Sequence, residues 1–197
     1  MVRILGGGTA MTLEQTFAQM VPRIETPRLI LRAPGLADFD GFAGYLASDR
    51  SRYTGGPMDR NLAWRGWGHA VGHWVMRGYG IFVIEDKATG RALGTTGPYF
   101  PEGWPEPEIA WTLWDSSTEG KGIAAEAALA GRAYAYETLG WTTAVSVILE
   151  GNTRSEALAE RLGCVRDGGM THPQFGATSI WRHPAADTQG AGMEAYA

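Results

Sequence analysis

A glycine-rich turn, Glu119-Gly120-Lys121-Gly122-Ile123-Ala124, separates a predicted strand from a predicted alanine-rich helix. Backbone N–H groups in the first turn of a helix have no partner within the helix, and the helix dipole adds partial positive charge there. Glycines also let the backbone come close to an anion. The turn therefore has the composition of a phosphate-binding site, although Gly-Lys-Gly before a helix is often only a loop.

Two familiar phosphate-binding motifs do not fit this turn. Lys121 is followed by Gly122, whereas a Walker A loop needs Ser or Thr after its lysine. The glycine spacing differs from that of a dinucleotide-binding fingerprint, and the turn comes late in the chain instead of after the first strand. The turn also lacks a nearby metal-binding carboxylate, so a nucleotide phosphate-binding protein is excluded.

A second polar segment, Asn152-Thr153-Arg154-Ser155, follows an apolar, β-branched stretch and opens a predicted helix. Asn is a favoured helix N-cap, and a first-turn serine hydroxyl often bonds to local backbone. Asn152 and Ser155 therefore either support the helix start or contribute polar groups to a binding site, and Asn152 can do both.

The spacing of apolar residues predicts the elements that position these segments. It predicts helices at 12–20, 36–48, 61–76, 123–138 and 152–162, and strands at 24–32, 79–85, 92–100, 108–114, 141–149, near 165 and at 178–181. This order predicts a mixed α/β (α+β) fold, with helices flanking a mostly antiparallel central sheet. We expect an N-terminal extension over 1–21, one domain over 22–184 and a C-terminal tail over 185–197.

The composition narrows the possible partners. The net charge is −4 and no run of Lys or Arg occurs, which argues against a nucleic-acid partner. The single cysteine excludes an intramolecular disulfide, and four scattered histidines predict no metal site. No segment reaches the roughly 18–20 apolar residues of a membrane span. Residues 1–10 are a poor signal peptide, so we expect a cytoplasmic protein.

Five short motifs occur in a specific order between residues 24 and 183. They are Thr26-Pro27-Arg28-Leu29-Ile30-Leu31-Arg32, Glu108-Ile109-Ala110-Trp111, Gly120-Lys121-Gly122-Ile123-Ala124-Ala125-Glu126-Ala127, Asn152-x-x-Ser155 and Arg161-Leu162-Gly163-Cys164. In these motifs the sequence resembles the GNAT superfamily of coenzyme A-dependent N-acetyltransferases. Within it, the chain is similar to the RimJ/RimL-like branch, which acetylates ribosomal-protein N-termini. The resemblance implies the GNAT-like acyl-CoA N-acyltransferase fold and acetyl-CoA as co-substrate.

The resemblance also implies which residues bind acetyl-CoA. Backbone amides of the glycine-rich turn would hold the pyrophosphate, and Asn152 and Ser155 would lie near the pantetheine arm and the thiol. A backbone N–H near Trp111 or Thr112 would stabilise the oxyanion of the tetrahedral intermediate. The expected cofactor-binding residues are Trp111, Thr112, Lys121, Gly122, Ile123, Ala124, Asn152 and Ser155.

Glu119 departs from the family pattern, which usually has Gln or Arg at this position. A carboxylate beside a pyrophosphate is repulsive, so Glu119 must point away or weaken the site. Lys121 is positioned to offset that charge.

Catalysis of this kind needs a base that takes a proton from the attacking amine and an acid that protonates the leaving thiolate. Glu108 is the expected base because it begins the strand that leads to the turn, with Glu106 and Glu102 as alternatives. Many family members place the acid, a tyrosine, one helical turn beyond Ser155. That position is Ala159 here, so Ser155 is the expected acid.

Several other reactive or aromatic side chains have simpler explanations. We expect surface or capping roles for the four histidines, and Cys164 is expected to be a small core residue because no histidine is placed to activate it. The aromatic set is expected to be core, with one or two members lining the acceptor cleft. The histidines are His69, His73, His172 and His183, and the aromatic set is Trp64, Trp67, Trp74 and Tyr79.

The leading hypothesis is an N-acetyltransferase that moves an acetyl group from acetyl-CoA to a primary amine by direct attack in a ternary complex. The acceptor in the resembled branch is a protein N-terminus. Two alternatives stay open: a small-molecule amine as acceptor, and a non-catalytic acyl-CoA-binding module, which Glu119 and Ala159 favour. The resemblance is compatible with a homodimer.

Overall fold

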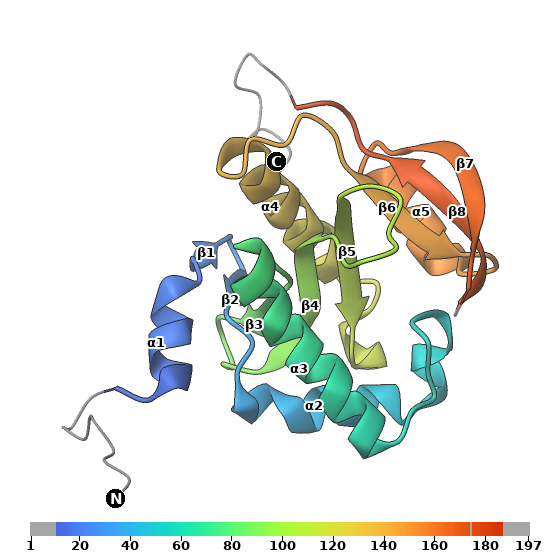
Figure 1. Ribbon diagram of the computed structural model, residues 1–197. Coiled ribbons are helices and arrows are strands. Elements are labelled where there is room, and N and C mark those ends of the chain that lie inside the picture. Colours follow the sequence, from blue (N-terminus) through green and yellow to red (C-terminus); the bar gives the residue numbers. More distant parts are fainter. Residues whose placement is uncertain (1–10, 174, 187–197) are drawn as a thin grey trace, which may run out of the picture.

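The structure is a computed structural model that describes residues 11–173 and 175–186. Its centre is an eight-stranded sheet with the order β1-β2-β3-β4-β5-β6-β8-β7 (Figure 1). All neighbouring strands are antiparallel except β5 and β6, which confirms the predicted fold class. The strands are β1 (Ile24–Glu25), β2 (Leu29–Arg32), β3 (Phe82–Asp86), β4 (Ala92–Tyr99), β5 (Glu108–Leu113), β6 (Val145–Leu149), β7 (Val165–His172) and β8 (Gly176–Arg182).

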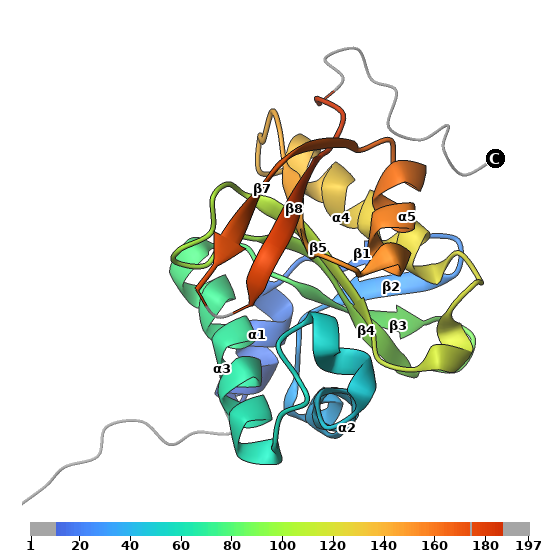
Figure 2. The ribbon, with the colours of Figure 1, turned by 90° about the vertical axis from the view of Figure 1, so that its right-hand side faces the viewer.

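Helices cover both faces of the sheet, with α4 and α5 on one side and α2 and α3 on the other (Figure 2). Strand β3 is buried on both faces: Phe82 and Ile84 pack with residues of α4, whereas Val83 packs with α2 and α3. The α-helices are α1 (Leu13–Met20), α2 (Phe39–Leu46), α3 (Arg60–Arg77), α4 (Ile123–Glu137) and α5 (Thr153–Arg161). Short 3-10 helices span Leu36–Asp38, Asp49–Tyr53 and Ser116–Thr118.

The two parallel strands separate soon after they meet. β5 and β6 share one ladder pair, Glu108 with Val145. The carboxyl ends of parallel strands lie at the same edge of a sheet, and here α4 follows β5 while α5 follows β6. The topology therefore brings the glycine-rich turn before α4 close to the Asn152 segment before α5, at the edge where the strands have separated.

The boundaries of several predicted elements differ in the structure. The strand predicted at 141–149 begins only at Val145, and the Trp141 ring instead packs edge-on against Tyr79 at 5.2 Å. The helix predicted at 36–48 is a 3-10 turn followed by α2. The last two strands, β7 and β8, are longer than predicted and form a hairpin.

The described part of the predicted N-terminal extension, which contains α1, packs against the rest of the chain. In α1, Thr12 is the N-cap, Phe17 packs against the core, and the Glu14 carboxylate accepts a hydrogen bond from the Leu36 backbone N–H at 2.7 Å. The parts of the predicted extension and tail at 1–10 and 187–197 lie outside the described residues. Within the described ranges, no helix combines the length and apolarity that crossing a membrane requires.

Candidate active site

The glycine-rich turn opens into a cavity of about 780 Å³. Gly120 and Gly122 adopt φ values of 70° and 74°, the left-handed region that favours glycine, and Gly122 is the N-cap of α4. Because the cap is a glycine, no side chain of its own covers the free N–H groups of the first helical turn. The cavity is lined by Gly122, Ile123 and Ala124 on this side.

A buried carboxylate fixes the start of α4 to the N-terminal strands. Glu126 accepts hydrogen bonds from Thr26 Oγ1 at 2.5 Å and from Arg28 N at 2.9 Å and Arg28 Nε at 2.6 Å. Burial opposes the charged form, but these donors outweigh it and hold the pKa of Glu126 below its ordinary value. Arg28 Nη1 also donates to the Lys121 carbonyl at 2.8 Å. The Lys121 side chain is exposed, and Lys121 is not among the residues that line the cavity.

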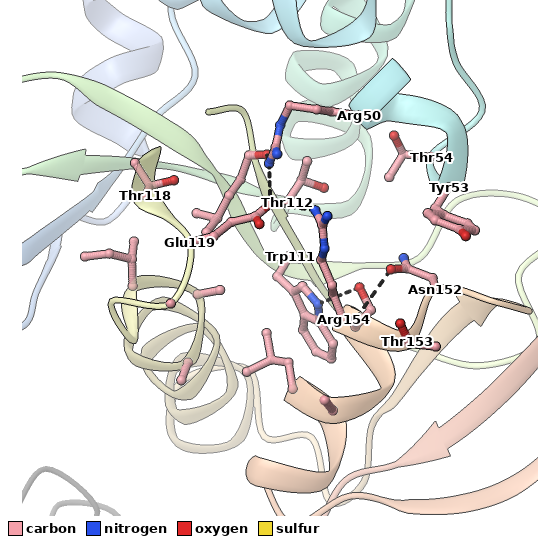
Figure 3. A pocket seen from close by; sticks show the side chains of 18 of the residues that line it. Arg50, Tyr53, Thr54, Trp111, Thr112, Thr118, Glu119, Asn152, Thr153 and Arg154 are labelled. Carbon is pink, nitrogen blue, oxygen red and sulfur yellow. Dashed lines mark hydrogen bonds and ion pairs between the residues drawn. The ribbon is translucent and has the colours of Figure 1, made fainter. Parts of the chain in front are cut away.

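Glu119 lies between two arginines from opposite walls of the cavity (Figure 3). Its Oε1 accepts hydrogen bonds from Arg50 Nη2 at 2.7 Å and from Arg154 Nη1 at 3.0 Å. The negative charge of Glu119 is thus offset by Arg50 and Arg154, and not by Lys121 as the sequence had suggested. Arg50 Nε is buried beneath the cavity wall and has no hydrogen-bond partner within the described part of the chain.

The first cavity is rich in arginine. Four arginines line it, against the carboxylates of Asp49 and Glu119. The arginines are Arg50, Arg52, Arg154 and Arg161. Sequence reasoning missed this set. Arg154 lies within the Asn152–Ser155 segment and could have been considered with it. Arg50 is far from that segment in the sequence and belongs to no recognisable motif.

A second cavity, of about 530 Å³, adjoins the first. The residues that line both are Tyr45, Tyr53, Thr54, Trp111, Thr112, Asn152 and Ser155. At this junction Trp111 Nε1 donates to Ser155 Oγ at 3.4 Å, and Asn152 Oδ1 accepts from the Ser155 backbone N–H at 3.4 Å (Figure 3). Asn152 is therefore the N-cap of α5 and also part of the cavity wall.

Glu108 is a buried carboxylate in the wall of the second cavity. It sits where β5 and β6 pair, and accepts hydrogen bonds from Trp104 Nε1 and from the Val147 backbone N–H, the latter at 3.2 Å. Burial raises the pKa of Glu108 to about 7 although both donors favour the charged form. This carboxylate can therefore accept a proton near neutral pH.

The two alternative bases are placed differently. Glu106 is bound by Arg182, at 2.7 and 3.0 Å, and lines neither cavity. The Arg182 guanidinium lowers the pKa of Glu106, which makes it a weak base. Glu102 is exposed but lines the second cavity.

Several expectations about the other side chains need correction. His73 and His183 are buried, not on the surface: His73 bonds to the Tyr79 carbonyl and the Phe100 N–H, and His183 contacts Ser146 and Arg132. Their ring nitrogens are satisfied inside the core, a pattern that sequence spacing does not reveal. His69 is exposed and lines the second cavity, where its Nε2 is 3.0 Å from the Tyr99 hydroxyl.

The aromatic set is also divided. Trp67 and Trp74 are core, as predicted, but Trp64 is 54% exposed, and no member of the set lines the second cavity. Apart from Trp111, the aromatic lining of the second cavity comes from residues not singled out in the sequence: Phe42, Tyr45, Tyr53, Tyr99, Trp104 and Phe175. Cys164 is buried in the core as predicted, and burial raises its thiol pKa to about 11.

Comparison with known proteins identifies the family. A model of the acetyltransferase (GNAT) domain matches residues 28–165. An acetyltransferase structure from Agrobacterium tumefaciens str. C58 is 33% identical, covers 90% of this chain and 99% of that chain, and has a TM-score of 0.76. Two structures share the fold at low identity. The ribosomal-protein-S5-alanine acetyltransferase from Vibrio fischeri is 16% identical (86% and 99% covered, TM-score 0.66). RimL, a ribosomal L7/L12 α-N-protein acetyltransferase in complex with coenzyme A, is 15% identical (82% and 97% covered, TM-score 0.67). This chain belongs to the GNAT family of acetyltransferases.

Proposed function

We propose that this protein transfers the acetyl group of acetyl-CoA to a primary amine by direct attack within a ternary complex. One observation carries the proposal: an arginine-rich cavity at a helix start meets a cavity that contains a buried carboxylate, and Ser155 lies at their junction. The first suits a phosphorylated co-substrate and the second suits an amine that must lose a proton.

The residues of the first cavity fit acetyl-CoA. The free N–H groups at the start of α4 suit phosphate oxygens, and Arg50 and Arg154 add positive charge to the cavity wall. When bound, acetyl-CoA supplies an activated thioester. The RimL structure that contains coenzyme A shares this fold, which supports the assignment. Trp111, Thr112, Asn152 and Ser155 are placed for the thioester end because they line both cavities.

Glu108 and Ser155 have complementary roles in this mechanism. Glu108 accepts a proton from the acceptor ammonium, directly or through water, and leaves a neutral amine. As the amine nitrogen bonds to the acetyl carbon and the carbon–sulfur bond breaks, the Ser155 hydroxyl donates its proton to the sulfur and takes up the second proton that the nitrogen loses, so that the amide, the free thiol and the serine hydroxyl are all neutral at the end. A backbone N–H of Trp111 or Thr112 stabilises the charge that develops on the acetyl oxygen.

The structure weakens the case for a non-catalytic acyl-CoA-binding module. Glu119 favoured that alternative, but Arg50 and Arg154 offset its charge. Ala159 is on the buried face of α5 and is fully enclosed in the core, so a tyrosine at this position would not fit as the structure stands. Ser155 is one of the hydroxyl-bearing residues at the junction of the cavities, and its Oγ accepts a hydrogen bond from Trp111 Nε1 there. The protein N-terminus as acceptor and the homodimer stay predictions drawn from the resemblance.

Calorimetry and thiol-release assays test the proposal together. We expect acetyl-CoA to bind at micromolar levels and thiol release to depend on an added amine. Glu108→Gln should lower kcat by about 100-fold, the typical contribution of a general base, while the Kd of acetyl-CoA changes little.

Glu106→Gln is the matched control, since this glutamate lies outside both cavities, and it should keep wild-type turnover. Absence of acetyl-CoA binding would overturn the proposed function. Unchanged turnover of the Glu108→Gln variant would overturn only its role as base.

A further inference from the structure

The two cavities differ sharply in charge. Four arginines line the first cavity, whereas among the described residues that line the second the only formal charges are the carboxylates of Glu102 and Glu108. An acceptor that carries a carboxylate or phosphate would meet like charge here and find no lysine or arginine among the described lining residues to pair with. An ammonium group without an acidic neighbour is complementary to this lining.

A continuous aromatic wall stands beside Glu108. Trp104 packs edge-on against Tyr99 at a centroid distance of 5.8 Å, and against His172 at 5.0 Å. His172 stacks on Phe175 at 4.6 Å. The wall joins the end of β4, the β4–β5 loop and the β7–β8 hairpin, and all four rings line the second cavity.

The wall is tied directly to the proposed base, because Trp104 Nε1 donates a hydrogen bond to the Glu108 carboxylate. A ring that packs against Trp104 is therefore held close to Glu108. Aromatic rings prefer edge-on or offset partners of this kind, at centroid separations of about 4.5–7 Å. The volume of about 530 Å³ falls within the range of small-molecule sites, roughly 300–1,000 Å³.

We propose that the acceptor is a small arylalkyl primary amine that carries no acidic group. This inference rests on the proposed function and adds the substrate class to it. The amine faces Glu108, the aromatic group packs on the wall of Tyr99, Trp104, His172 and Phe175, and the acidic lining rejects amino acids and other acceptors with a carboxylate.

A panel of matched amines with acetyl-CoA tests the substrate class by thiol release. We expect kcat/KM for 2-phenylethylamine to exceed that for hexylamine by about 5-fold, the value of an aromatic contact beyond simple burial. Phenylalanine, which adds only a carboxylate, should fall by about 100-fold because its charge faces Glu102 and Glu108 without a partner. A peptide with an N-terminal phenylalanine tests the protein N-terminus as acceptor, and we expect slower turnover than with the free amine.

Two variants connect these preferences to named residues. Phe175→Leu should remove most of the preference for 2-phenylethylamine over hexylamine and leave the Kd of acetyl-CoA unchanged. Glu102→Lys should raise turnover of phenylalanine by about 2- to 5-fold, the scale of a partly exposed ion pair. Trp64→Leu is the matched control, since Trp64 is exposed and lines neither cavity.

The failures of the two proposals are distinguishable. Faster turnover of phenylalanine or of the peptide than of 2-phenylethylamine, or equal rates for 2-phenylethylamine and hexylamine, would overturn the substrate class and leave the acetyltransferase assignment standing. If none of the amines in the panel supported thiol release, and acetyl-CoA did not bind, both proposals would be overturned.

Discussion

At the scale of single residues, Glu108 combines opposing influences on one carboxylate. Burial disfavours its charge, and hydrogen bonds from Trp104 and Val147 favour it, with a pKa of about 7 as the result. The deprotonated form that acts as base is present above this pKa. We therefore expect kcat/KM for the amine to rise as the pH increases through about 7, as measured in a pH–rate profile.

Trp104→Phe tests the balance directly. The variant keeps a ring but removes the N–H that donates to Glu108, so the pKa of Glu108 should rise. The rising limb of the pH–rate profile should then move to higher pH, while the Kd of acetyl-CoA stays constant. Trp64→Phe is the control on the exposed face of α3. A limb that did not move would show that Glu108 does not set the pH dependence.

Glu119 provides a second test of local electrostatics. Its carboxylate neutralises part of the positive charge that Arg50 and Arg154 bring to the first cavity. Glu119→Gln keeps the shape of the side chain and removes the negative charge. Acetyl-CoA should therefore bind about 2- to 5-fold more tightly in low salt, the scale of a partly exposed pair, with a smaller gain in high salt.

Calorimetry at two salt concentrations measures this effect, and Glu150→Gln, on a glutamate outside both cavities, is the control. Weaker binding of acetyl-CoA by Glu119→Gln would mean that Glu119 serves mainly to hold the two arginines in place.

At the scale of elements, the start of α4 depends on a carboxylate from its own first turn. Glu126 binds Thr26 and Arg28, and so connects the N-terminal strands to the glycine-rich turn. Glu126→Gln replaces one acceptor oxygen by a donor that faces other donors. We expect a loss of about 1–3 kcal/mol in the free energy of unfolding. We also expect acetyl-CoA to bind more weakly, with a higher Kd.

Urea denaturation and calorimetry check the two effects, with Glu137→Gln at the exposed end of the same helix as control. A destabilised variant with unchanged acetyl-CoA affinity would show that the contact supports the fold alone.

Helices, turns and strands could be predicted from the sequence where residues close together in the chain determine them. The glycine turn, the N-cap at Asn152 and the alanine-rich helix have local causes, and the structure has all three. The strand expected at 141–149 starts late because its pairing depends on β8, a distant strand whose ladder with it begins only at Val145, opposite Arg182. The buried ring of His73 is likewise invisible in the sequence, because its partners at Tyr79 and Phe100 are set by packing.

At the scale of the whole molecule, the site is assembled from segments that are far apart in the chain. Arg50, Glu119 and Arg154 meet across the first cavity, and Trp104 meets Phe175 beside the second. No spacing rule connects such positions. The family motifs pointed to the turn, Glu108 and Ser155, but the arginines of the first cavity and the aromatic wall come together only when the sheet has formed.

Two buried groups, His183 and Glu108, have opposite effects on how the stability of the whole molecule depends on pH. Burial lowers the pKa of His183 to about 3, from an ordinary value of 6.5, so the unfolded chain binds its proton more readily and stability is lost as the pH falls from 6.5 toward 3. Glu108 has a raised pKa, so it contributes stability below about 4.5 that is lost as the pH rises toward 7. Between 4.5 and 6.5 the two effects oppose each other.

Urea midpoints measured from pH 3 to pH 8 separate these contributions. Glu108→Gln leaves the His183 effect unopposed, so its midpoint should rise more steeply with pH between 4.5 and 6.5 than that of the wild type. His183→Gln should show the reverse, a midpoint that falls, or rises less, over the same interval. His69→Gln, on an exposed ring, should follow the wild-type curve. Parallel curves for the Glu108→Gln variant and the wild type would show that the pKa of Glu108 is not raised in the folded protein, and would remove the physical basis for its activity limb near pH 7.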